Sequence, residues 1–181
     1  AYRYGFTRAK NNSDANARRE YLYDAIGFKP SGMNFTTGAF DYGSWENFIN
    51  SVSRPVMLKT DGTVDYELYR GDFTKKVDGV TASDVSNTSY AGNAMIEFKK
   101  LWVRRYEDTG FEYVIFSNVQ YDANYKAYAH TNALGNVKDA FYWGAFKGSN
   151  VSSKLRSIAD QTIMVSQTRN TEASYAAAIG S

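Results

Sequence analysis

The residues of this sequence that could catalyse a reaction are few. His130 is the single histidine and there is no cysteine, so this chain cannot build a histidine cluster, a mixed zinc site or a cysteine nucleophile. No serine lies in the Gly-x-Ser-x-Gly turn that many hydrolases place beside their histidine. We therefore expect His130 to end a strand, where it packs or forms hydrogen bonds. We predict no catalytic residue and no metal site.

Two groups of carboxylates could serve a glycan-degrading enzyme. Asp65 and Glu67 share one face of a predicted strand, and Glu107, Asp108 and Glu112 cluster around a predicted turn. A glycosidase needs two carboxylates roughly 5–9.5 Å apart across a cleft. Exposed strands also carry carboxylates that discourage unwanted edge pairing. We prefer this second interpretation and keep the glycan-degrading enzyme as a third hypothesis of function.

Basic and aromatic residues that lie next to one another could bind nucleic acid. Arg104 and Arg105 follow Trp102, an arrangement that could stack bases. The two arginines point to opposite faces of a strand, however, and Glu107, Asp108 and Glu112 follow closely, so we expect cross-strand pairing of arginine with glutamate instead. No calcium loop or phosphate-binding glycine loop is complete in the sequence. We predict no nucleic-acid partner and no cofactor.

Aromatic residues are the one feature that indicates binding. They make up 16% of the chain, with 15 tyrosines and 11 phenylalanines, more than a core of this size requires. Exposed rings beside Asn, Asp and Gln could hold sugars, and the same rings could form a subunit interface. Both interpretations stay open. The candidate binding residues are Tyr121, Tyr125, Tyr128, Tyr142 and Trp143.

Length and charge limit the class of protein. The chain has 181 residues and a formal net charge of +2, which gives no overall field that would attract nucleic acid or an anionic membrane. No run approaches the ~18 apolar residues of a membrane helix, so we predict no membrane partner. We expect a single β-rich domain over 1–181, or a fragment of a longer chain, with a subdivision into 1–93 and 94–181 as the alternative.

The fold is predicted to centre on a hairpin. Asp108-Thr109-Gly110 separates two aromatic and β-branched runs, and both faces of the second run are apolar, which is typical of a central strand. We expect helices capped by Ser44 and Asn170, the second covering 171–179, and a short helical turn over 154–159. Residues 81–93 should form a surface loop. Further strands are predicted over 1–10, 18–24, 56–59, 64–69, 125–131 and 137–146. The fold class is therefore α+β: an antiparallel, hairpin-rich sheet with a few short helices.

Eight segments of the chain share a pattern with one group of proteins: Lys59–Tyr66, Asp84–Asn87, Lys126–Thr131, Phe146–Ser149, Lys154–Ala159, Thr168–Thr171, Tyr175-Ala176 and Ile179–Ser181. These segments resemble tail-fibre-like virion proteins of bacteriophages from gut and related bacteria. In that group, a run of this kind ending in a Tyr-Ala helix introduces a C-type-lectin-like or formylglycine-generating-enzyme-like region. Two features depart from the group's pattern: Ile158–Met164 replaces a run that contains proline, and the chain stops at Ser181 before the lectin-like half. We therefore transfer no binding residues.

The resemblance implies a structural or adhesive protein of a phage particle. Such a protein would self-associate, contact other virion proteins and bind host-surface polysaccharide. It would be assembled in the host bacterial cytoplasm and reside in the virion. The alternative is a secreted or cell-surface carbohydrate-binding module, which would be extracellular.

Overall fold

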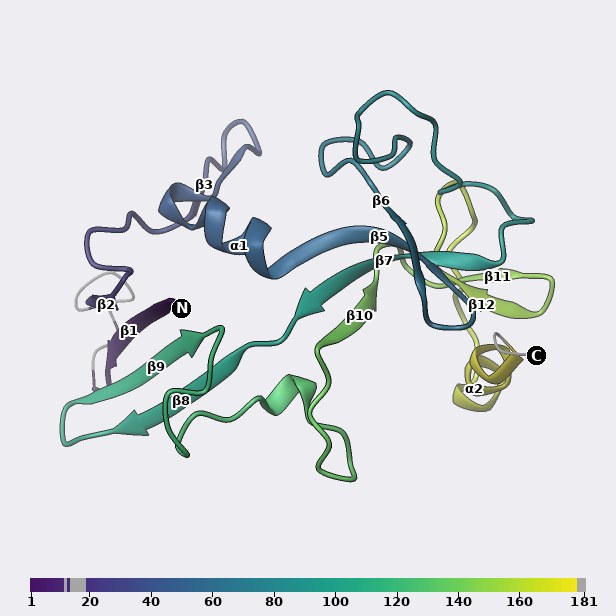
Figure 1. Cartoon of the computed structure of the whole chain (residues 1–181). Coiled ribbons are helices and arrows are strands. Elements are labelled where there is room, and N and C mark those ends of the chain that lie inside the picture. The colour runs from purple at the N-terminus through teal and green to yellow at the C-terminus, as the bar shows by residue number, and fades with distance from the viewer. Residues whose placement is uncertain (12, 14–18, 179–181) are drawn as a thin grey trace. The chain divides into compact units, whose positions relative to one another are not determined.

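A computed structural model describes residues 1–11, 13 and 19–178 of the chain. Most of the regular structure is antiparallel sheet, with two short α-helices (Figure 1). The chain divides into two compact units. Unit 1 comprises Ala1–Val52 and Lys99–Phe141, and unit 2 comprises Ser53–Phe98 and Tyr142–Ser181. Among the described residues, neither α-helix has the length and apolar composition needed to cross a membrane.

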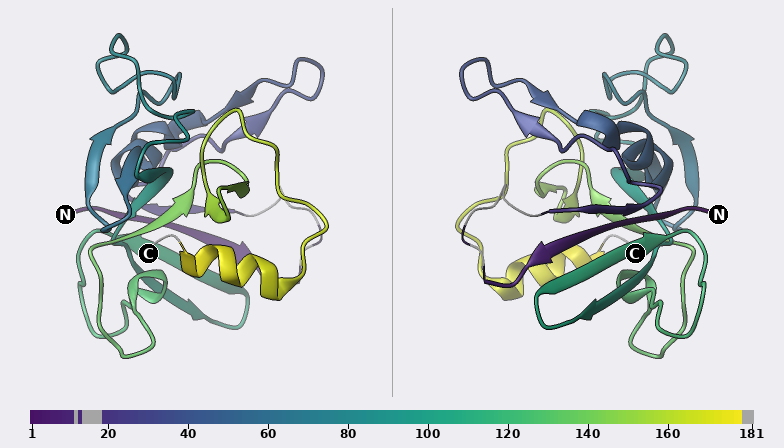
Figure 2. Two further views of the ribbon diagram at one scale, coloured as in Figure 1. Left: turned by 90° about the vertical axis from the view of Figure 1, so that its right-hand side faces the viewer. Right: turned by 90° about the vertical axis from the view of Figure 1, so that its left-hand side faces the viewer.

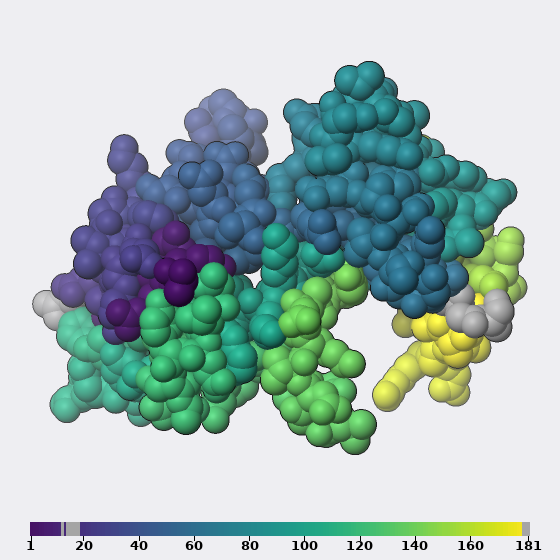
Figure 3. All heavy atoms as spheres, viewed as in Figure 1, coloured from purple at the N-terminus to yellow at the C-terminus, as the bar shows by residue number. Residues whose placement is uncertain are grey.

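Unit 1 contains a four-stranded antiparallel sheet in the order β2-β1-β9-β8. The predicted hairpin around Gly110 is confirmed as β8 and β9, and β9 lies inside the sheet as expected, whereas β8 is an outer strand. Figure 2 shows β1 beside this hairpin in its right-hand view, and Figure 3 shows the purple N-terminal residues against the green ones. The strands are β1 (Arg3–Ala9), β2 (Tyr21–Tyr23), β8 (Trp102–Glu107) and β9 (Phe111–Ser117).

An aromatic cluster covers one face of this sheet. Phe48, on helix α1 (Glu46–Val52), lies with its ring centroid 6.5 Å from that of Phe116 on β9 and 5.1 Å from that of Tyr4 on β1. Trp45 packs edge-on against Tyr4 at 6.1 Å. Such edge-to-face pairs stabilise a core beyond the area that they bury. The aromatic side chains that β1 and β9 direct to this face, Tyr4 and Phe116, are therefore explained by the helix that packs against them.

The start of α1 differs from the prediction. Ser44 is not its N-cap, because the Ser44 hydroxyl accepts a hydrogen bond from the backbone N–H of Lys29 at 2.9 Å. A 3₁₀ helix, Gly43–Trp45, leads directly into α1. Gly43 has φ +59°, and a Cβ there would lie 2.5 Å from the Pro30 carbonyl oxygen. Close packing of the 29–30 backbone therefore fixes this corner, which a local capping pattern does not reveal.

The predicted strand over 125–131 is wrong. Tyr128–His130 forms a 3₁₀ helix, and only Lys126 pairs with a strand, through a bridge to Val103. His130 is buried, and its ring lies 5.0 Å from Phe141 in an edge-on arrangement. His130 therefore packs as expected, although from a helical turn and not from a strand end.

Unit 2 is built on the sheet β10-β7-β5-β6. Its buried core consists of Met57, Leu68, Val85 and Ala94. Residues 81–93 are predicted as a surface loop, and the segment is irregular up to Ala91, before β7. Val85 within it is buried, so this part of the segment belongs to the core. The strands are β5 (Ser53–Lys59), β6 (Val64–Glu67), β7 (Gly92–Lys99) and β10 (Ala140–Gly144), the last beginning in unit 1.

Small elements complete both units. In unit 1, β3 (Gly32–Met33) pairs with β4 (Phe40–Asp41), and in unit 2, β11 (Ser149–Val151) pairs with β12 (Lys154–Arg156). The predicted helical turn over 154–159 is wrong, because Ser152 and Ser153 have φ of 52° and 60° and form the tight turn of a hairpin.

Helix α2 (Arg169–Ala177) confirms the predicted C-terminal helix with a shifted start. Its N-cap is Thr168, whose hydroxyl accepts from the backbone N–H of Thr171 at 3.2 Å, and not Asn170. Glu172 lies in the first turn, where a negative charge is favourable. The predicted stop at Gly180 lies outside the described residues.

Candidate functional site

The five predicted binding residues have different surroundings. Tyr121 and Tyr128 in unit 1 are 45% and 63% exposed, and Trp143 in unit 2 is 70% exposed. Tyr142 is half-buried. Tyr125 is only 1% exposed, so its assignment to an aromatic surface is corrected. The prediction counts Tyr125 among aromatic residues in excess of what a core requires, whereas the fold buries its ring in the core.

Tyr121, one of the two exposed tyrosines of unit 1 in this set, already has a cation against its ring. The Arg3 guanidinium lies 4.7 Å from the ring centroid of Tyr121 and 4.1 Å from that of Tyr23. Cation–π contacts of this kind use the ring face that a sugar would need. Tyr121 is therefore less suited to sugar stacking than an aromatic residue whose face is open.

Trp143 meets that requirement at a pocket of unit 2. Along β10 successive side chains point to opposite faces, so Tyr142 turns toward Glu97, to which its hydroxyl donates at 3.1 Å, and Trp143 turns the other way. The pocket has a volume of about 350 Å³. Its lining comes from β7, β10, β12 and the connection after β10: Asn93, Met95, Trp143, Gly144, Phe146, Lys147, Gly148, Leu155, Arg156 and Ser157.

A buried arginine gives this pocket its charge. Arg156 is 8% exposed, and its guanidinium donates to Oδ1 of Asn93 at 3.1 Å and to the backbone carbonyls of Tyr90, at 2.7 Å, and Gly92. All three acceptors are neutral, and no carboxylate of the described residues lies within ion-pair distance. Burial lowers the pKa of Arg156 from its usual value, yet arginine keeps its proton in proteins. The pocket wall therefore holds a cation without a counter-charge.

Two further polar groups face the same pocket. Oδ1 of Asn93 accepts from Arg156 and from the backbone N–H of Ser157 at 2.9 Å, which fixes the amide orientation. The Nδ2 group of Asn93 has no acceptor among the residues that the structure describes, so it can donate to a ligand. Lys147 is exposed at the rim. The lining thus combines an open indole face, an amide donor and two cations, with no carboxylate.

The hydroxyl of Ser157 joins the elements around the pocket. It donates to the carbonyl of Ala94 at 2.8 Å and accepts from the backbone N–H of Phe146 at 3.0 Å. These bonds tie β7 to the segments that follow β10 and β12. The polar groups of the pocket are consequently held on a hydrogen-bonded frame before any ligand arrives.

The carboxylates considered for catalysis have structural partners. Asp65 binds Nζ of Lys59 at 3.0 Å and accepts from the Tyr90 hydroxyl at 3.0 Å, which together lower the pKa of Asp65. Glu67 lies 3.5 Å from Nη1 of Arg54. These contacts occupy both carboxylates of the pair that the glycosidase hypothesis requires.

The carboxylates of the β8–β9 hairpin are likewise paired. Glu112 binds Arg8 at 2.7 Å, and Glu107 binds Lys10 at 3.1 Å. The cross-strand pairing of arginine with glutamate that was predicted for Arg104 is wrong. Arg104 binds Asp122 instead, at 3.3 Å.

Comparison with known proteins gives no relative for this chain. No protein-family model, no curated protein sequence and no solved structure matches it. The pocket around Trp143 therefore has to be interpreted from its own chemistry.

Proposed function

We propose that this protein is a non-enzymatic adhesive component of a bacteriophage particle that binds acidic polysaccharide on the host surface. The observation that carries the binding part is the pocket in which exposed Trp143 lies beside the uncompensated charge of Arg156. The virion part rests on the sequence resemblance to tail-fibre-like proteins. In the same proposal the chain is an α+β protein whose C-terminal part begins a C-type-lectin-like region, and it assembles as an oligomer with other virion proteins.

The pocket chemistry favours an acidic sugar over a neutral one. An indole face packs against the apolar face of a sugar ring. A carboxylate on that ring would receive charge-assisted hydrogen bonds from Lys147 and Arg156, which are roughly twice as strong as bonds between neutral groups. The volume of about 350 Å³ is at the small end of ligand pockets, so we expect one or two sugar rings of a longer polymer to be held.

Binding to immobilised polysaccharides tests this proposal. We expect the wild-type protein to bind polymers that contain uronic or other acidic sugars, and to bind neutral polymers of the same length at least tenfold more weakly. W143A and K147Q should each weaken binding about tenfold. Y69A is the matched control, because Tyr69 is an exposed aromatic residue of unit 2 outside the pocket lining. Equal binding by W143A and wild type would refute the site.

A secreted carbohydrate-binding module is the second candidate, because the same pocket would serve it. The two candidates differ in location. Immunogold electron microscopy of phage particles, with an antibody against this chain, would label the virion under the first proposal. Label confined to the culture medium or the cell surface would favour the second.

A glycan-degrading enzyme remains the third candidate, on the carboxylates alone. If a polysaccharide were cleaved by the wild-type protein and equally well by D65N and E67Q, those residues would have no part in the reaction. Loss of cleavage in both variants, with folding retained, would favour the enzyme over the adhesive protein.

A further inference from the structure

The outer edge of β8 offers backbone hydrogen-bonding groups to a partner. The backbone of Val103 both donates to Lys126, at 2.8 Å, and accepts from it, at 2.9 Å. Lys126 lies on the side of β8 away from β9, so Val103 points its N–H and C=O outward. In an antiparallel sheet the direction alternates along the strand. Arg105 and Glu107 therefore also direct their backbone groups outward.

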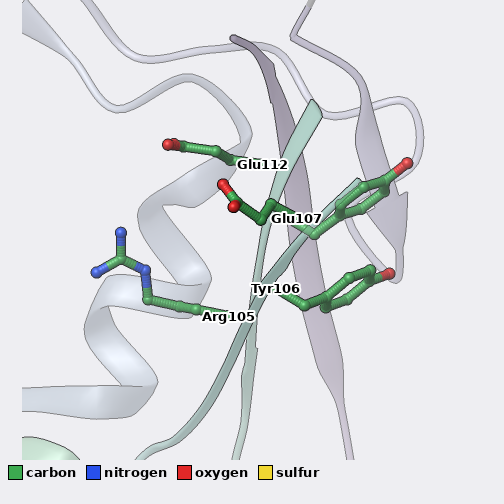
Figure 4. Close-up of a pocket in the computed structure, with 5 residues that line it drawn as sticks. Arg105, Tyr106, Glu107 and Glu112 are labelled. Atoms are coloured by element: carbon green, nitrogen blue, oxygen red, sulfur yellow. The ribbon is translucent and has the colours of Figure 1, made fainter. Parts of the chain in front are cut away.

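Beyond the bridge at Val103 this edge is open. No backbone partner for Arg105 or Glu107 exists among the described residues, and both side chains are exposed. A hollow of about 220 Å³ lies here, lined by Arg105, Tyr106, Glu107, Glu112 and Tyr113. Figure 4 shows the side chains of Arg105, Glu107 and Glu112 on one side of the strands and Tyr106 on the other.

The charged side chains along this edge would be complemented by a second copy of the same edge. Arg8, Glu112 and Glu107 lie opposite one another across β1, β9 and β8, so two carboxylates are neighbours, which is unfavourable. Glu107, at the edge, has Lys10 as its cation. Arg105, two residues along the same edge, has no ion-pair partner within the described part of the chain.

We propose that two copies of the protein pair antiparallel through their β8 edges, with Arg105 of each copy opposite Glu107 of the other. This inference rests on the self-association contained in the proposed function and names the surface that performs it. Because Arg105 and Glu107 both point outward, each such pair exchanges both of its backbone hydrogen bonds. The two-fold axis passes beside Tyr106, so that Tyr106 of one copy lies opposite Tyr106 of the other. The partner's arginine completes the row Arg8–Glu112–Glu107 with a positive charge, and the two sheets become one.

Charge-reversal variants test this pairing by analytical ultracentrifugation. R105E places Glu opposite Glu, and E107R places Arg opposite Arg, so each variant alone should dimerise at least about tenfold more weakly than wild type. An equimolar mixture of R105E and E107R restores both opposite-charge pairs. We expect the mixture to form a heterodimer as readily as wild type forms its dimer. Because neither variant has to refold for this rescue, simple misfolding cannot produce it.

Each other result would overturn the inference in a recognisable way. A wild-type protein that is monomeric throughout the micromolar range would remove both this interface and self-association from the proposed function. A wild-type dimer that R105E leaves intact would remove this interface only. A mixture that stays monomeric although the wild type dimerises would also remove it. Polysaccharide binding, measured on the same variants, reports separately on the Trp143 pocket, which contains neither residue.

Discussion

Arg54 and Glu97 lie directly opposite each other on β5 and β7, and their side chains form a two-point ion pair. Nε of Arg54 donates to Oε1 of Glu97 at 2.7 Å, and Nη2 donates to Oε2 at 3.1 Å. The Tyr142 hydroxyl donates to the same carboxylate. The bond to Glu97 raises the pKa of Arg54, whereas burial, followed by the bond to Glu97, raises the pKa of Tyr142. One carboxylate thus links three strands of unit 2.

Replacing this carboxylate should weaken the fold. We expect E97Q to lower the free energy of unfolding by about 2 kcal/mol, less than the full cost of breaking a buried pair because Arg54 is partly exposed. E67Q is the control: Glu67 contacts the same arginine at 3.5 Å from a more exposed position, so its loss should cost at most about 0.5 kcal/mol. Urea unfolding measures both. Equal losses would show that Glu97 has no special role.

Acid should destabilise the hairpin turn through Asp108. Its carboxylate accepts from the backbone N–H groups of Gly110 and Phe111 and from the Tyr113 hydroxyl, with distances of 2.8–2.9 Å, and these bonds hold the pKa of Asp108 below its usual value. A depressed folded-state pKa stabilises the protein above the unfolded pKa of about 3.9, and this stability is lost as the pH falls below it. D108N should therefore reduce the loss of stability between pH 6 and pH 3, measured by urea unfolding.

The matched control for this pH effect is D160N. The Asp160 carboxylate accepts no hydrogen bond from the described residues, and its positive φ of 59° suits asparagine equally well. D160N, measured alongside, shows the effect of replacing an aspartate whose carboxylate does not hold a turn. If D108N kept the pH dependence of the wild type, the turn hydrogen bonds would not be the source of acid sensitivity.

Gly92 should not tolerate a side chain. A Cβ at this position would overlap the Leu58 carbonyl oxygen and lie 2.6 Å from a ring carbon of Tyr90. Because the nearest atom is backbone in a paired strand, we expect G92A to cost at least about 2 kcal/mol. G110A is the control, since nothing lies within 4 Å of its Cβ position, and it should change stability by about 0.5 kcal/mol or less. Thermal unfolding of both variants decides the point.

The sequence predicts local hairpins better than it predicts segments shaped by distant contacts. The strands around Gly110 are recognisable because β-branched and aromatic runs flank a turn former, all within a few residues. Ser44 looks like a helix cap, but it binds Lys29. The segment 154–159 is predicted as a helical turn, but the tight turn at Ser152 and Ser153 pairs its first residues, Lys154–Arg156, as strand β12. Such errors arise where tertiary packing outweighs local propensity.

The candidate site shows the same limit. Trp143 could be selected from the sequence as an aromatic residue of an exposed strand. Asn93 and Arg156 could not, because they are 63 residues apart and meet only through the hydrogen bond between their side chains. Arg156 has no nearby sequence signal that distinguishes it from a surface arginine. Only the fold shows that it is buried among neutral acceptors.

Tyr125 and Tyr121 provide the sharpest test of which aromatic residues belong to the surface. Tyr125 is buried, so Y125A should leave a cavity and lower the free energy of unfolding by about 3 kcal/mol. Tyr121 is exposed and contacts Arg3 through its ring, so Y121A should cost about 1 kcal/mol or less. Urea unfolding of the two variants measures the difference. Similar small losses for both would restore Tyr125 to the aromatic surface predicted from the sequence and would contradict the turn at 128–130.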